Sequence, residues 1–233
     1  MNIWEVFHKS FIIQKGYINV LNGLAVTIVT AICALIVGII LGTIVAFVQI
    51  SDGKGRPVLK FFKWICKGYD AFFRGTPIVV QLLFIYFVIF PSIGLALHPA
   101  TYVGVIIFGL NSGAYVSEIM RGGILSVDKG QTEAGRALGL SGVQTMIKIV
   151  FPQAVKNVIP TIANEFVSLL KETSVLSFIG VVDMTQAFRQ IAGANYEYTV
   201  PYLILALCYL VLVLVASNLV KLLERRMRAS ERR

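Results

Sequence analysis

Charged side chains are scarce in this sequence and absent from three long stretches. Only 14% of the 233 residues are Asp, Glu, Lys or Arg, whereas a soluble domain carries about 25%. No charged residue occurs in 16–51, 75–117 or 198–220. A membrane-spanning helix needs about 20 apolar residues, so these stretches argue against an ordinary soluble domain and predict a polytopic membrane protein.

Residues that carry enzyme chemistry are also few. The two histidines lie far apart, and the three cysteines fall in separate segments without metal-like or disulfide-like spacing. We therefore expect no catalytic residue, no metal site and no cofactor in this chain. The sequence contains no Gly-x-x-x-x-Gly-Lys-Ser/Thr phosphate loop, so any ATP and Mg²⁺ must bind to another chain. The first uncharged stretch is too long for a signal-peptide core, and none is expected.

The apolar pattern predicts an all-α membrane protein with five transmembrane helices. The 75–117 stretch holds two of them, separated by a turn at Pro91 and His98-Pro99. A short interfacial segment (1–19) precedes the transmembrane domain (20–224), and a basic tail (225–233) follows it. The five expected spans are about 21–50, 77–90, 101–125, 143–170 and 201–223.

The basic residues are distributed asymmetrically along the chain. Sixteen of the twenty-one lie in 54–74, 121–148 and 221–233, at alternate span ends. This is the positive-inside pattern, and it explains the net charge of +9 without invoking nucleic acid. With five spans, the N-terminus is expected outside and the C-terminus in the cytoplasm. Aromatic residues among the lysines of 57–74 suit a helix at the lipid headgroups.

Two expected spans carry polar stripes at helical spacing. The fourth span has Asn157, Thr161, Asn164, Ser168 and Lys171 on one face, with Glu165 and Glu172 beside it. The third has Asn111, Tyr115 and Glu118. A carboxylate at membrane depth costs about 2.5–3.5 kcal/mol and usually faces a cavity or a partner. These stripes predict either a hydrophilic pathway or hydrogen bonds between packed helices.

The polar segment 128–152 interrupts the apolar spans. Residues 132–138 suit a short helix, and Gly139 stands where a C-cap glycine belongs. Its apolar face (Ala134, Leu138, Leu140) has little to bury against within a membrane domain. We therefore predict that the loop 126–142 is a docking surface in the cytoplasm.

Residues 133–152 resemble the EAA loop of ABC-importer membrane subunits. Glu133, Ala134, Gly139, Ile149 and Pro152 match its spacing, with Gly135 in place of the third-position Ala and Phe151 in place of Leu. Runs at 74–77, 111–123, 129–131 and 164–174 are similar to the polar amino acid uptake subfamily. This resemblance implies a type I importer permease of a prokaryotic cytoplasmic membrane.

The resemblance also implies partners and site residues. The expected partners are two cytoplasmic ATPase subunits, a second permease subunit, an extracytoplasmic solute-binding protein, a polar amino acid and membrane lipid. ATPase coupling is expected at Glu133, Ala134, Gly135, Ala137, Leu138 and Gly139. The substrate pathway is expected at Asn111, Tyr115, Glu118, Asn164, Glu165, Ser168, Thr173 and Ser174.

Two questions stay open at this point. An ion-coupled carrier or channel acting without an ATPase is the alternative function, although carriers often contain two related halves and this sequence has no internal repeat. A basic amino acid, glutamine or cystine would each suit a single intramembrane acid. One complete set of motifs fits a homodimer and leaves a heterodimer open.

Overall fold

The computed structural model describes residues 3–51, 55–95 and 99–231, and the regular structure within them is entirely helical. The expected all-α class is therefore confirmed. Parts of the expected turn (His98) and of two basic clusters (Lys54, Arg232, Arg233) lie outside the described residues. The helices are α1 (Ile3–Phe7), η1 (His8–Ile13), α2 (Gly16–Ile50), α3 (Pro57–Gly75), α4 (Ile78–Phe84), η2 (Ile85–Ile89), α5 (Phe90–Ser92), α6 (Thr101–Leu125), α7 (Lys129–Ala137), α8 (Gly142–Thr145), η3 (Met146–Val150), α9 (Phe151–Glu172), η4 (Thr173–Ile179), α10 (Met184–Asn195) and α11 (Thr199–Glu231).

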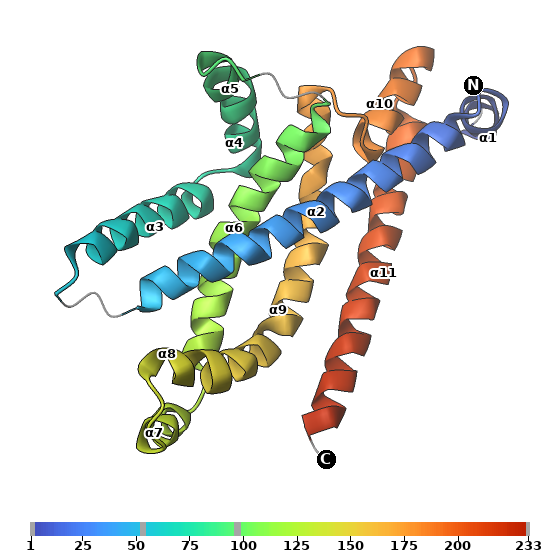
Figure 1. Ribbon diagram of the computed structural model, residues 1–233. Coiled ribbons are helices and arrows are strands. Elements are labelled where there is room, and N and C mark those ends of the chain that lie inside the picture. Colours follow the sequence, from blue (N-terminus) through green and yellow to red (C-terminus); the bar gives the residue numbers. More distant parts are fainter. Residues whose placement is uncertain (1–2, 52–54, 96–98, 232–233) are drawn as a thin grey trace.

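Helices α2 and α6 form the central contact of the bundle, with α2 crossing it diagonally (Figure 1). Glycine allows this close approach. A Cβ on Gly38 would lie 2.7 Å from the hydroxyl oxygen of Ser112, and one on Gly42 would lie 2.7 Å from the carbonyl oxygen of Gly113. The spacing Gly38-x-x-x-Gly42 therefore marks the face of α2 that packs on α6.

Three helices in the described residues are long and apolar enough to cross a membrane: α2, α6 and α11. The pair α3 and α4–α5 adds a fourth candidate, although it is bent by 111°. Helix α9 continues from α8 and η3, but its polar stripe makes it less apolar than the other spans. Length and composition thus identify up to four of the five expected spans, and the remaining one, expected at 143–170, corresponds to α9.

The bend lies between Gly75 and Ile78. Thr76 and Pro77 both have extended backbone conformations, and α4 begins at the residue after the proline. Proline disfavours helical geometry in the preceding residue, so the chain turns at Thr76. The 57–74 segment is helical as expected, but it forms the first arm of a sharply bent pair.

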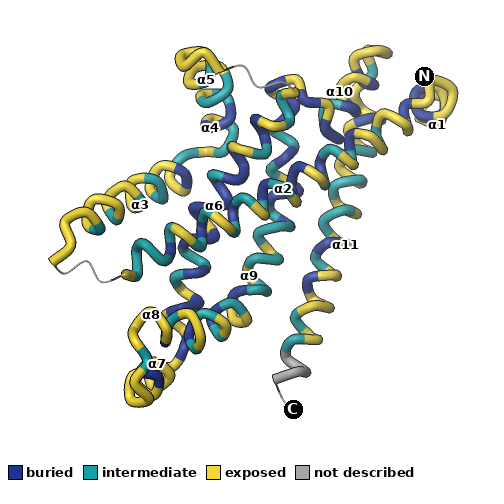
Figure 2. Tube along the Cα trace, viewed as in Figure 1, coloured by how far each residue is buried: buried dark blue, intermediate teal, exposed yellow. Residues whose placement is uncertain are grey.

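The main core lies where α2, α4, α6, α9 and η4 meet, around Leu82, Phe108 and Leu169, which are fully buried. A second cluster fixes the N-terminal segment. Phe11 packs on Phe188 of α10 with ring centroids 5.7 Å apart. Burial is concentrated in α6 and along the crossing with α2, while α3 and α7 are largely exposed (Figure 2).

Candidate functional site

Helix α7 is held at both ends by its own sequence. Asp128 caps the start, where its carboxylate accepts a 2.6 Å hydrogen bond from the amide of Gly130. At the other end Gly139 adopts a φ of 80°, and the amides of Gly139 and Leu140 donate to the carbonyls of Arg136 and Gly135. This paired arrangement satisfies the last carbonyls of the helix. The predicted C-cap role of Gly139 is confirmed.

The outer face of α7 has no partner in the described chain. Glu133, Ala134, Ala137 and Gly139 are exposed, and the Leu138 side chain is 80% exposed. The helix projects from the end of the bundle where α6 ends and α9 begins (Figure 1). Leu138 is thus an apolar contact point on an otherwise polar, exposed face.

The inner face of α7 packs on the helix that leads into α9. Gly135 is the one buried residue of α7, and a Cβ at this position would lie 2.6 Å from the Cγ2 atom of Thr145. The amide of Gln153 on α9 also donates a 3.2 Å hydrogen bond to Gln131. These contacts connect α7 directly to the start of α9.

The α9 stripe lies on one exposed face, as its spacing predicted. Asn157, Thr161, Asn164 and Lys171 are exposed and Ser168 is half-buried. The opposite face, including Val158, Val167 and Leu170, is buried in the bundle. Polar side chains at membrane depth need another partner or water, so this face is where a hydrophilic pathway could run.

The other predicted pathway residues near α9 differ in their surroundings. Glu165 is half-buried on α9. The Thr173 hydroxyl is buried and donates a 2.9 Å hydrogen bond to the carbonyl of Leu170. Ser174 is half-buried and borders a groove that Lys171 also lines. Of these predicted residues, Glu165 and Ser168 are thus partly accessible on α9, whereas Thr173 lies inside the core.

Asn111 of the α6 stripe is buried against the bend between α3 and α4. Its amide nitrogen donates to the carbonyl of Phe73 at 3.1 Å and to the side-chain oxygen of Gln81 at 2.9 Å. The amide nitrogen of Gln81 in turn donates to the carbonyls of Phe73 and Thr76 at 2.9 Å. The two amides satisfy backbone groups that the bend leaves without helical partners.

Tyr115 and Glu118 lie outside this buried network, on the exposed part of the α6 stripe. The guanidinium of Arg74 lies 5.9 Å from the centre of the Tyr115 ring. Glu118 forms ion pairs with Arg74 at 3.4 Å and with Arg121. The three predicted α6 residues therefore separate into one buried amide and one exposed cluster at the bend.

Two functional candidates were missed by the sequence analysis. Asp70 on α3 accepts hydrogen bonds from Gln49 of α2 at 2.6 Å and from Ser117 of α6 at 3.0 Å. The neighbouring Tyr69 hydroxyl donates to the carbonyl of Leu110. Asp70 is the lone acid in the basic segment 57–74. This isolated acid is the sequence feature that could have identified it as a candidate. These residues fasten α3 to the central helix pair.

No group of three or more His, Cys, Asp or Glu side chains capable of holding a metal occurs among the described residues. The geometry instead offers an exposed docking helix attached to a helix with a polar face. Such an arrangement can transmit the movement of a partner into the membrane domain.

The chain belongs to the family of binding-protein-dependent transport system inner membrane components, whose model matches residues 38–229. It is therefore a multi-pass protein of the cytoplasmic membrane, and the expected place among the permease subunits of amino acid ABC importers is confirmed. Permease subunits of this family leave ATP hydrolysis to a partner ATPase.

Curated relatives align over almost their whole length. The chain is 39% identical to the arginine transport system permease protein ArtQ of Bacillus subtilis (strain 168), over 91% of this chain and 94% of that protein. It is 38% identical to the putative glutamine transport system permease protein GlnP of Rickettsia typhi (strain ATCC VR-144 / Wilmington), over 89% and 92% of the two chains.

Two solved structures share the fold. A crystal structure of an amino acid ABC transporter with histidines matches at a TM-score of 0.82 and 37% identity, covering 92% of this chain and 96% of the other. An inward-facing MetNI methionine ABC transporter matches at a TM-score of 0.72 and 16% identity, covering 90% and 95%. The second match supports the fold alone.

Proposed function

We propose that this permease subunit moves polar amino acids into the cell by alternating access, driven by a separate ATPase that binds α7. The observation that carries the proposal is the exposed face of α7, with Leu138 80% exposed beside Glu133. This face has the EAA spacing, and the sequence contains no phosphate loop of its own. The energy source must then act through a docked partner.

The proposed assembly contains two permease subunits, as a homodimer, and two ATPase subunits that bind ATP and Mg²⁺. In this assembly α9 forms the fourth of five spans, the N-terminus is outside, and α7 and the C-terminal tail are cytoplasmic. An extracytoplasmic solute-binding protein delivers the substrate. ATP shifts the conformational equilibrium only if the ATPases bind it more tightly in one state than in the other.

The proposed substrate pathway runs along the polar face of α9. Glu165 provides the charge that attracts a substrate ammonium group, and Asn164, Ser168 and Ser174 supply polar groups along the same end of α9. The predicted pathway residue Thr173 is not part of this face, because its hydroxyl is buried and bonded to the carbonyl of Leu170. From α6, Tyr115 and Glu118 add polar groups to the pathway beside the bend between α3 and α4. Asn111 acts indirectly, through its hydrogen bonds to Phe73 and Gln81 at the same bend. Basic amino acids and glutamine are the preferred substrates, which fits the arginine and glutamine systems named for the relatives.

Two measurements test this proposal. Affinity purification of this chain from its native membrane is expected to recover a stoichiometric ATPase, and recovery without any ATPase would contradict the assembly. The ATPase activity of the complex, measured with its binding protein across a panel of amino acids, then identifies the substrate. Stimulation by a basic amino acid or glutamine supports the proposed class, and stimulation by acidic or apolar amino acids alone opposes it.

A further inference from the structure

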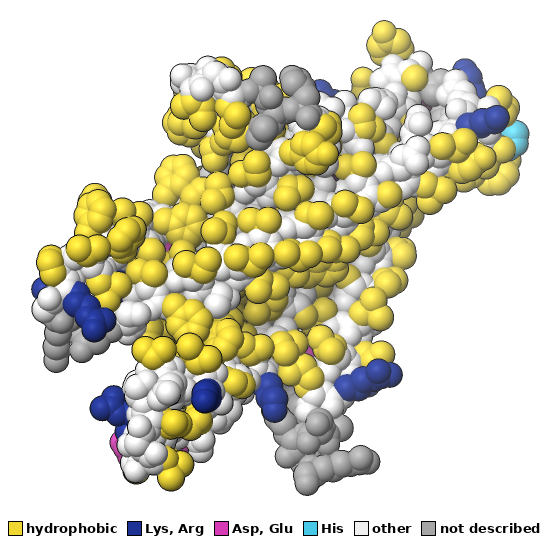
Figure 3. Space-filling model, in the orientation of Figure 1, with side chains coloured by type: hydrophobic (Ala, Val, Ile, Leu, Met, Phe, Trp, Pro, Cys, Tyr) yellow, Lys and Arg dark blue, Asp and Glu magenta, His cyan; other side chains and the backbone are white. Residues whose placement is uncertain are grey.

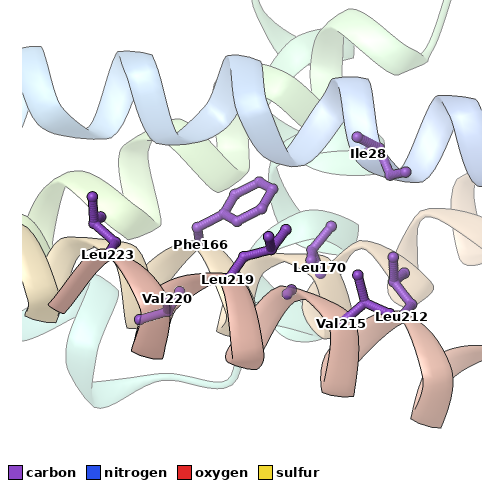
Figure 4. A pocket seen from close by; sticks show the side chains of 9 residues that line it. Ile28, Phe166, Leu170, Leu212, Val215, Leu219, Val220 and Leu223 are labelled. Atoms are coloured by element: carbon purple, nitrogen blue, oxygen red, sulfur yellow. The ribbon is translucent and has the colours of Figure 1, made fainter. Parts of the chain in front are cut away.

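An apolar groove lies on the side of the bundle away from the polar face of α9, where α2, α9 and α11 meet. It has a volume of about 350 Å³. Ile28 lines it from α2, Phe166 and Leu170 line it from α9, and α11 contributes Leu212, Val215, Ala216, Leu219, Val220 and Leu223. Figure 4 shows Leu219 directed between Phe166 and Leu170. All nine lining residues are apolar.

We propose that this groove binds one acyl chain of an anionic membrane phospholipid, whose headgroup pairs with Arg226. The site is separate from the proposed substrate pathway and from α7. It gives the permease a specific lipid ligand, in addition to the lipid that surrounds any membrane protein.

The first argument is continuity with the lipid-facing surface. The adjacent outward row of α2 consists of exposed aliphatic residues that include Val29, Ile32, Ile36, Ile40 and Ile44. Hydrophobic side chains cover this side of the molecule along α2 (Figure 3). A large exposed apolar surface marks a membrane or protein contact, and Ile28 of the groove directly precedes Val29 of this row.

The second argument is length. The groove follows α11 from Leu212 to Leu223, which at 1.5 Å per residue is about 16 Å. One leaflet of a bilayer is about 15 Å thick, half of the hydrocarbon core. A single extended acyl chain therefore matches the groove from end to end.

The third argument is charge at one end of the groove. Arg226 is exposed and follows Leu219 and Leu223 at seven- and three-residue spacing, which places it on the same face of α11. This helix turn contains one acid, Glu224, and two bases, Arg225 and Arg226, so its net charge is positive. A phosphate headgroup of an acyl chain in the groove would lie at this level. The charge favours an anionic lipid over a zwitterionic one.

An acyl chain bound in the groove would also affect the packing of α9 against α11. Phe166 faces the groove and directly follows Glu165, and the groove separates parts of α9 and α11. An acyl chain that fills this space supports α9 from behind its polar face. We therefore expect bound anionic lipid to stabilise the transporter against unfolding.

Native mass spectrometry of the purified transporter, equilibrated with equal amounts of phosphatidylglycerol and phosphatidylcholine, tests the proposal. We expect one tightly retained phosphatidylglycerol per permease subunit, with about fivefold preference over phosphatidylcholine. Leu219→Trp is expected to displace this lipid, whereas Leu214→Trp, at an exposed position outside the groove, is expected to retain it.

Two variants that each remove one positive charge distinguish headgroup recognition from acyl-chain binding. Arg226→Gln is expected to keep a bound lipid and lose the preference for phosphatidylglycerol, while Lys221→Gln, on the opposite face of α11, keeps the preference. Equal retention in wild type and Leu219→Trp, or an unchanged preference in Arg226→Gln, would overturn the proposal. So would efficient disulfide cross-linking between two copies through Leu219→Cys, since the groove would then be covered by protein.

Discussion

The side-chain amide of Asn111 on α6 donates a 2.9 Å hydrogen bond to the side-chain oxygen of Gln81 on α4. This bond lies on the α4 side of the 111° bend between α3 and α4. It also joins two buried residues, which are 3% and 1% exposed. The bend between α3 and α4 is thus anchored to the central helix by paired amides, and this anchor has testable consequences.

Asn111→Ala should reduce stability because it leaves the Gln81 oxygen buried without a donor. An unsatisfied buried polar group costs about 1–3 kcal/mol. Thermal unfolding of the purified complex in detergent measures the loss. The control is Asn164→Ala, since Asn164 is exposed and donates only to the carbonyl of its own helix at Pro160. A stable Asn111→Ala complex with altered substrate selectivity would instead place Asn111 in the pathway.

Gly135→Ala should impair transport although alanine is the better helix former. The added Cβ would lie 2.6 Å from Thr145 Cγ2 and 3.1 Å from Ile149 Cδ1, and such overpacking costs about 1–3 kcal/mol. ATP-driven uptake measures the effect. Thr145→Ser removes the Cγ2 methyl group, so the double variant Gly135→Ala/Thr145→Ser should recover uptake. Failure of the double variant to recover would show that the space beside Thr145 does not limit this position.

Glu133→Lys should abolish ATP-driven uptake without unfolding the permease, because Glu133 is exposed and the charge reversal falls on the proposed ATPase-binding face. Uptake and co-purification of the ATPase are measured together. Glu224→Lys makes the same charge change on α11 and should leave both intact. Unchanged uptake in Glu133→Lys would remove the docking assignment from α7.

Glu165→Ala should lower uptake about tenfold or more while the complex still assembles, because a charge-assisted contact with substrate contributes about 1.5–3 kcal/mol. Glu224→Ala is the comparison, since it removes the same carboxylate from α11, outside the proposed pathway, and uptake by this variant should stay near the wild-type level. Normal uptake and selectivity in Glu165→Ala would indicate that Glu165 only holds helices together.

The long apolar stretches predicted the helices well, because the absence of charge is set by the membrane and not by tertiary contacts. Residues 101–125 are helical over the expected range, and α2 begins five residues before the expected start at 21. Gly139 was also predictable, since a helix end that needs a positive φ favours glycine. The helix expected from 143 begins at Gly142, where α8 leads through η3 into α9.

The bend and the partners of single polar residues could not be read from the sequence. Thr76-Pro77 indicates a break, but neither its 111° angle nor the hydrogen bond between Gln81 and Asn111, 30 residues apart, follows from the local sequence. The sequence showed Gly135 only as a replacement for the third-position Ala, whereas the structure shows that Thr145 of the following helix leaves no room for a Cβ there. Asp70 accepts hydrogen bonds from side chains on two other helices, α2 and α6. Such contacts arise only when the chain is folded.

Uptake into proteoliposomes tests the central claim most directly. Vesicles containing the assembled complex, loaded with ATP and Mg²⁺ and supplied with binding protein outside, should accumulate radiolabelled amino acid. Vesicles containing this chain alone, with an ion gradient and no ATPase, should accumulate none. Accumulation by this chain alone would contradict the account and identify an ion-coupled carrier instead.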